Sequence, residues 1–292
     1  MPDSLICKDA EPELAPSSRS SFPWLILLAA FFLSRVSFLI VGVLQRDYSI
    51  FLAPHEGGWT YAENSLIGIW TGWDSGAYLS LAVNGYEKSR ATADIPLDGF
   101  LPLFPYLASV CSSRLEAVLV TGLLISNLGF LLAGITLYEL LEPRWGRSLA
   151  FRSALLLFIN PFSFYGSCFL TEGVFCFLLI SAFFFGQRGA PLPCVAACSM
   201  LAVTRMIGIV LAPIIIASML YSRRIRGIKL LLCSTALSLV AYLPLLAHIM
   251  SIRQQTGEWL RVFTIHKIWG RLAPEGPVSS FMAYIQANLA AA

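Results

Sequence analysis

Long apolar runs, separated by short polar or basic breaks, fill most of this chain. The first run, residues 22–44, is long enough to cross a bilayer as one helix, because about 20 apolar residues span the hydrocarbon core. Further runs follow one another between residues 115 and 250. The pattern predicts an all-α, polytopic integral membrane protein with a large first extracytoplasmic loop.

Basic residues at the breaks predict which ends of the helices lie in the cytoplasm, since cytoplasmic turns are rich in Lys and Arg. One basic turn carries Arg144, Arg147 and Arg152, and Arg188 marks the next. The apolar segment between these turns must therefore go out and return. Its tip would lie between Asn160-Pro161, where proline ends the incoming helix, and Glu172, which begins the returning helix near its positive end.

A second hairpin is predicted between Arg188 and the basic residues 223–229, with its tip at Thr204-Arg205. A single span would leave Arg205 at the bilayer centre at a cost of about 3 kcal/mol, whereas a hairpin lifts it to the outer surface. A last span is expected at residues 230–250. The count is then seven crossings with the amino terminus inside, if the hairpins are complete rather than re-entrant.

These elements give an expected division of the chain. Residues 1–21 form a disordered cytoplasmic tail, 22–44 the first transmembrane helix and 45–114 an extracytoplasmic loop with a candidate catalytic acid. Residues 115–250 contain transmembrane helices 2–7, including both hairpins, and 251–292 form an extracytoplasmic or interfacial segment.

Composition supports a membrane class and excludes others. Hydrophobic residues make up 57% of the chain, charged residues 13%, and the mean hydropathy is +0.72, so lipid must cover apolar surface that no soluble globule of this length hides. A net charge of +3 is too small to indicate nucleic-acid binding. Most of the seven cysteines fall in apolar runs and the three histidines are scattered, which disfavours disulfides and a metal site.

Candidate chemistry centres on Asp74, which follows Trp73 in the first loop. A carboxylate partly shielded from water suits a general base, because desolvation raises its pKa. Helix capping explains Asp74 equally well. The predicted topology brings Asp74, Asn160, Glu172, Arg205 and the segment Trp269-Gly270-Arg271 to one non-cytoplasmic face.

Three arginines each admit two interpretations. Arg205 and Arg271 suit a phosphate or pyrophosphate leaving group, through paired hydrogen bonds, or they anchor the protein to phospholipid head groups. Arg35 lies inside the first span, where it either faces a polar site or extends to the interface.

Several motifs resemble one known family. The order Trp73-Asp74, Tyr78, Ala82, Gly85-Tyr86 and Glu87, then Phe100-x-Pro102-x-Phe104-Pro105, resembles the first luminal loop of PIG-V-type mannosyltransferases, the GPI mannosyltransferase 2 family and its bacterial relatives. Matches to later segments follow in order: Asn160-Pro161 with Thr171-Glu172, then Thr204-Arg205…Gly208, then Thr256-Gly257…Trp269-Gly270-Arg271.

The resemblance implies a GT-C-like helical bundle and a GT-C-type enzyme. Such an enzyme moves a sugar, typically mannose, from a polyprenyl-phosphate donor to a hydroxyl of a lipid-linked or extracytoplasmic acceptor, with inversion and without a metal or other cofactor. By position, Asp74 is the implied catalytic acid of the first loop. The residues expected to bind substrate are Trp73, Tyr78, Tyr86, Glu87, Asn160, Glu172, Arg205, Trp269 and Arg271.

Other expectations stand beside this one. Short loops favour a bacterial plasma-membrane protein, and the endoplasmic reticulum membrane is the alternative. Family members usually continue through further spans beyond the position of Ala292, so a fragment, a divergent short form and an inactive relative are all considered. The alternative function is a non-enzymatic carrier or flippase for lipid-linked sugars, or a scaffold.

Overall fold

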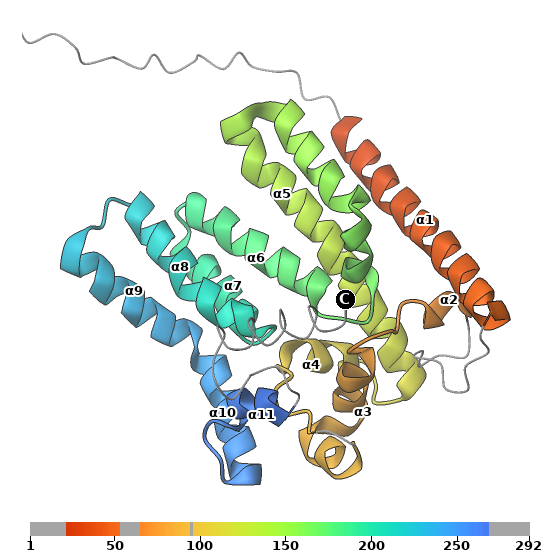
Figure 1. Ribbon diagram of the computed structural model, residues 1–292. Helices are drawn as coiled ribbons and strands as arrows, with labels where there is room; N and C mark the ends of the chain where they lie inside the picture. Colours follow the sequence, from red (N-terminus) through yellow and green to blue (C-terminus); the bar gives the residue numbers. More distant parts are fainter. Residues whose placement is uncertain (1–21, 53–64, 94–95, 269–292) are drawn as a thin grey trace, which may run out of the picture.

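The computed structural model describes residues 22–52, 65–93 and 96–268, and every regular element in these ranges is a helix (Figure 1). The predicted all-α fold is therefore confirmed. The helices are α1 (Phe22–Leu52), α2 (Ser65–Gly68), α3 (Ser75–Thr92), α4 (Leu103–Ser109), α5 (Leu115–Ile159), η1 (Pro161–Ser167), α6 (Glu172–Gln187), α7 (Pro191–Ala202), α8 (Met206–Ser222), α9 (Gly227–Ala241), α10 (Leu243–Thr256) and α11 (Arg261–Ile268).

Two of these helices, α1 and α5, are individually long and apolar enough to cross a membrane. The pairs η1–α6 and α9–α10 also qualify as bent spans, with angles of 99° and 49° at their breaks, and α7 and α8 are shorter apolar helices. The described residues thus contain two helices that could cross a membrane, or up to four spans if each bent pair is one, and the number of crossings stays a prediction.

Helix α5 is two antiparallel limbs rather than one rod. Gly146 interrupts it with a φ of +76°, a left-handed conformation that favours glycine. A Cβ on Gly134 would lie 2.1 Å from the Phe158 ring, although 24 positions in a straight helix would separate them by about 36 Å. The chain therefore reverses at the basic turn expected between residues 141 and 153 (Figure 1).

The remaining helix breaks lie at the expected residues. α5 ends at Ile159, directly before Asn160-Pro161, and α6 begins at Glu172. Arg205 separates α7 from α8. Both hairpin tips are thus built from the polar residues that interrupt the apolar runs.

The basic turns gather at one end of the bundle. Arg144 and Arg188 line one small cavity, where Arg188 pairs with Glu139 at 3.5 Å, and Arg223 donates a hydrogen bond to the carbonyl of Gly189. The sidedness of this end in a membrane remains a prediction from its positive charge.

The predicted last span, residues 230–250, is not one straight helix. It breaks at Tyr242, between α9 and α10. Pro244 explains the break, because proline lacks an amide donor and its ring clashes with the carbonyl four residues earlier. The hydropathy pattern alone does not predict this bend, because Pro244 lies within an apolar run.

Arg35 joins α1 to the first hairpin tip, and it is only 8% exposed. Its Nη1 donates to the Ser163 carbonyl and to Ser167 Oγ, and its Nη2 donates to the Phe158 carbonyl and to Ser163 Oγ, at 2.6–3.0 Å. Nε donates to Ser34 Oγ at 3.3 Å. All five donors of the guanidinium are thereby used. Arg35 is a structural cross-link, so neither sequence interpretation of it holds.

Replacing Arg35 by lysine tests this cross-link. Lysine carries three donors in a different geometry and leaves buried oxygens of η1 unpaired, at about 1–3 kcal/mol for each. We expect a lower thermal-unfolding midpoint in detergent than for Arg152→Lys, a matched change at an exposed position of α5. Equal midpoints for the two variants would contradict the cross-link.

The orientation is tested by labelling single cysteines in intact membranes, in a background without the native cysteines. Cysteines replacing Lys88 and Gln254 should react with an impermeant thiol reagent from the non-cytoplasmic side, and those replacing Arg144 and Ser222 should not. All four positions are exposed, so each is able to react when its side is reached. The reverse pattern would overturn the orientation.

Candidate active site

The turn that presents Asp74 is held in an unusual conformation. Trp73 has a φ of +55°, which costs a residue with a side chain roughly 1 kcal/mol or more. Ring contacts hold it there, because Trp73 packs against Phe164 and Tyr165 with centroid separations of 5.8 and 5.0 Å. Both partner rings belong to η1, so the first hairpin tip fixes the backbone beside Asp74.

Asp74 directly precedes α3, yet its side chain makes no capping hydrogen bond to that helix. The structure therefore gives no support to the capping explanation. Asp74 is also exposed. This corrects the expectation that its carboxylate is partly shielded from water, because Trp73 and Asp74 both lie at the surface of the described chain.

Arg205 is bound to the start of α6. Its Nη1 pairs with Glu172 Oε1 and donates to Thr171 Oγ1 at 3.0 Å. Within the described part of the chain, its Nε and Nη2 make no hydrogen bond, and its side chain is 39% exposed. Glu172 Oε2 is buried and also has no partner there. Two nitrogens of Arg205, Nε and Nη2, are thus available to a ligand beside the carboxylate of Glu172.

Tyr78 links α3 to this pair. Burial raises the pKa of Tyr78 to about 12, while a side-chain hydrogen bond with Thr171 and the charge of Arg205 lower it, and the charges of Glu172 and Asp74 raise it further. Electrostatic interactions likewise join Arg205 to Glu172, Tyr78 and Asp74. We call Asp74, Tyr78, Thr171, Glu172 and Arg205 the Asp74–Arg205 cluster. It assembles residues from three separate segments predicted to share one face.

A cavity of about 630 Å³ lies beside this cluster, between the limbs of α5, η1 and α6. Glu172 and Asn160 line it near the hairpin tip, whereas Leu137 and Ser153 line it about 10 Å further along the helices, by the rise of 1.5 Å per residue. Most of the wall is apolar, and the neighbouring Leu156 and Phe162 side chains are 62% and 78% exposed. Such a cavity fits an apolar chain with a polar end.

Asn160 also has a local structural role. Its Oδ1 accepts a hydrogen bond of 2.8 Å from the amide of Phe162 and so caps η1. The side chain lines the cavity from this fixed position.

Other predicted site residues lie elsewhere. Tyr86 donates to the Phe100 carbonyl at 2.6 Å and its ring packs against His248, and burial raises its pKa well above the usual value. Glu87 is exposed on α3, beyond the non-helical Gly85. Trp269 and Arg271 lie outside the described residues.

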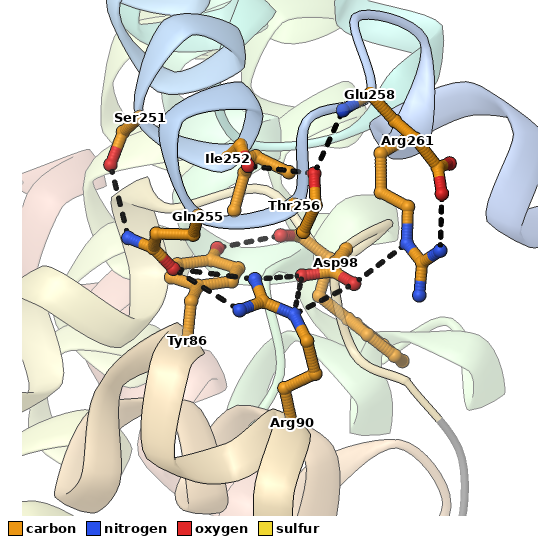
Figure 2. Close-up of polar contacts among 10 residues, drawn as sticks. Tyr86, Arg90, Asp98, Ser251, Ile252, Gln255, Thr256, Glu258 and Arg261 are labelled. Atoms are coloured by element: carbon orange, nitrogen blue, oxygen red, sulfur yellow. Dashed lines mark hydrogen bonds and ion pairs between the residues drawn. The ribbon is translucent and has the colours of Figure 1, made fainter.

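A buried acid that the sequence argument did not select, Asp98, lies beside Tyr86 (Figure 2). Its carboxylate is 1% exposed and accepts hydrogen bonds from Arg90 and Arg261. Its setting among Pro96, Leu97, Phe100 and Leu101 is the signal that could have identified it.

No group of three or more His, Cys, Asp or Glu side chains in residues 22–52, 65–93 and 96–268 is arranged to hold a metal ion. The Asp74–Arg205 cluster itself pairs carboxylates with a guanidinium and hydroxyl groups, which are suited to proton transfer and anion binding.

Comparison with known proteins identifies the family of the chain. The family model described as mannosyltransferase (PIG-V) matches residues 52–250, more than half of the chain, and this match includes the whole Asp74–Arg205 cluster. No curated protein and no solved structure matches the chain. The chain belongs to the PIG-V mannosyltransferase family and is a membrane mannosyltransferase.

Proposed function

We propose that this protein transfers mannose from a polyprenyl-phosphate donor to a hydroxyl of a lipid-linked or extracytoplasmic acceptor, with inversion at the anomeric carbon, on the non-cytoplasmic face of the membrane. The observation that carries the proposal concerns Arg205. Glu172 fixes its Nη1, whereas its Nε and Nη2 are available to a ligand near Asp74.

Arg205 is the proposed phosphate-binding residue. A guanidinium recognises phosphate oxygens through two parallel N–H donors, and Nε with Nη2 forms such a pair. Because Glu172 and Thr171 hold Nη1, the remaining edge is oriented before substrate arrives. This preorganisation favours the negative charge that grows on the leaving phosphate.

Asp74 is the proposed general base. It would take the proton of the acceptor hydroxyl as the acceptor oxygen bonds to the anomeric carbon. The bond from that carbon to the phosphate oxygen breaks, and its electron pair leaves with the phosphate that Arg205 binds. Because attack and departure occur on opposite sides of one carbon, a single displacement inverts its configuration. Exposed Asp74 would gain its shielding from water only when donor and acceptor cover it.

The cavity beside Glu172 supports a donor with a hydrocarbon chain. Its volume of about 630 Å³ lies in the usual range of small-molecule sites, and it extends from the polar cluster along apolar helix surfaces. A chain entering past Leu156 and Phe162 would leave its phosphate at the end marked by Glu172. Family membership favours this enzyme over the alternative, a non-enzymatic carrier of lipid-linked sugars.

Further substrate contacts are proposed around this cluster. Exposed Trp73, next to Asp74, and Tyr78, which interacts with the charge of Asp74, would contact the sugar. Asn160, in the cavity wall, would contact the lipid chain. Tyr86 and Glu87 lie outside the Asp74–Arg205 cluster and would contact a part of the substrate that extends past it. Trp269 and Arg271 are retained from the resemblance alone.

Asp74→Asn tests the proposed base. The amide cannot take the proton, so kcat for mannose transfer from polyprenyl-phosphate mannose should fall about 100-fold or more, with folding unchanged. Glu116→Gln is the matched control, because Glu116 is an exposed acid in the first turn of α5 and has no part in the cluster. Activity within a few-fold of wild type in Asp74→Asn would remove the assigned role.

A further inference from the structure

Asp98 forms a buried ionic junction between three segments (Figure 2). Arg90, in the last turn of α3, donates to Oδ1 from Nη2 at 2.6 Å and from Nε at 3.2 Å. Arg261, the first residue of α11, donates from Nε to Oδ2 at 3.2 Å. Arg90 also donates to Gln255 Oε1 on α10 at 3.3 Å. The carboxylate thus joins α3 to α11, and Arg90 extends the junction to α10.

The charges of this junction make it sensitive to the loss of Asp98. Two guanidinium groups, each with about a fifth of the side chain exposed, converge on a carboxylate that is almost fully buried. Removing one partner of a buried pair leaves uncompensated charge and separates the segments that it joined. Glu258, which accepts from Arg261 at 3.1 Å, is 54% exposed and is a weaker counter-charge.

The junction lies beside a hydrophobic group that reaches the Arg205 turn. Leu245 and Ile252 of α10 and Val262 of α11 pack with Leu101 and with Val203, all at most 5% exposed. The amide of Leu103 donates to the Val203 carbonyl at 3.1 Å. Met206, on the other side of Arg205, packs against the same group.

Arg205 is therefore supported from two sides. Glu172 and Thr171 bind its guanidinium, whereas its backbone neighbours Val203 and Met206 pack on helices that Asp98 ties to the first loop. A shift of α10 and α11 would move the backbone of Arg205 relative to Glu172. Misplacement of about 1 Å at a site is enough to affect its function strongly.

We propose that Asp98 is a positioning residue for phosphate recognition: through Arg90 and Arg261 it holds α10 and α11 against the first loop and so sets the position of Arg205. This inference rests on the proposed role of Arg205 in binding the lipid phosphate. Asp98 itself touches no part of the proposed substrate.

The test measures binding of a polyprenyl phosphate and of the polyprenol of equal chain length to the purified full chain. Asp98→Asn should weaken polyprenyl phosphate binding about tenfold, because one hydrogen bond to a charged group typically contributes that much affinity. Polyprenol binding should stay unchanged. General destabilisation would instead affect both probes or neither. Glu139→Gln, which removes an exposed ion pair at the opposite end of the bundle, is the control and should change neither value.

A double-mutant cycle with Arg205→Gln decides whether Asp98 acts through Arg205. If it does, Asp98→Asn costs no further phosphate affinity in the Arg205→Gln background, because the contact is already lost. A second tenfold loss would overturn the proposal. Should Asp98→Asn fail to fold, Arg261→Gln leaves the Arg90 bond in place and is subject to the same cycle.

Hydrogen exchange separates this inference from the proposed function. Asp98→Asn should speed amide exchange in residues 203–209, whatever substrate the enzyme uses. Unchanged exchange there would overturn the positioning role even if the donor is a lipid phosphate. A different outcome is that the wild type binds polyprenyl phosphate and polyprenol equally, while Asp98→Asn exchanges faster. That outcome would contradict the lipid-phosphate donor but support the positioning of the Arg205 turn by Asp98.

Discussion

The guanidinium of Arg35 fixes the place at which the site is assembled. A charge inside an apolar span is tolerated only when its donors are satisfied, and here all five are used on α1 and the first hairpin tip. The η1 turn that it holds carries Phe164 and Tyr165, which in turn pack against Trp73 beside Asp74. Glu172 follows η1 within a few residues. The positions of Trp73, Asp74 and Glu172 thus depend on the buried guanidinium of Arg35.

Arg35 and Arg205 show how the same side chain serves structure or function according to how many of its donors the protein uses. Arg35 is almost fully buried and leaves no donor for a ligand. Arg205 is held by Glu172 and Thr171 through one nitrogen only, and it faces the surface with the rest. A fixed but incompletely paired cation next to a carboxylate is suited to an anionic leaving group. The apolar cavity beside it is suited to the chain of a lipid.

The apolar pattern and the basic turns were sufficient to predict the helices and their main breaks, because proline, glycine and clustered arginines act locally. The basic turn that contains Gly146 and the breaks at Pro161 and Arg205 lie where the sequence indicates. The bend at Tyr242 was missed because Pro244 sits in an otherwise continuous apolar run. Local patterns are weakest for residues whose role depends on distant partners. Asp98 meets Arg261 across 163 positions, and Arg35 meets Ser163 across 128. The exposure of Asp74 likewise follows from the tertiary placement of its turn.

The central claim is that this mannosyltransferase takes its sugar from a lipid phosphate bound at Arg205. In the most direct test, the purified protein in lipid receives radiolabelled mannose linked either to a polyprenyl phosphate or to a nucleoside diphosphate. The measurement determines which donor is consumed and the anomeric configuration of the product. We expect consumption of the lipid-linked donor alone and an inverted product. Transfer from the nucleotide sugar, or retention of configuration, would contradict the proposed donor and mechanism.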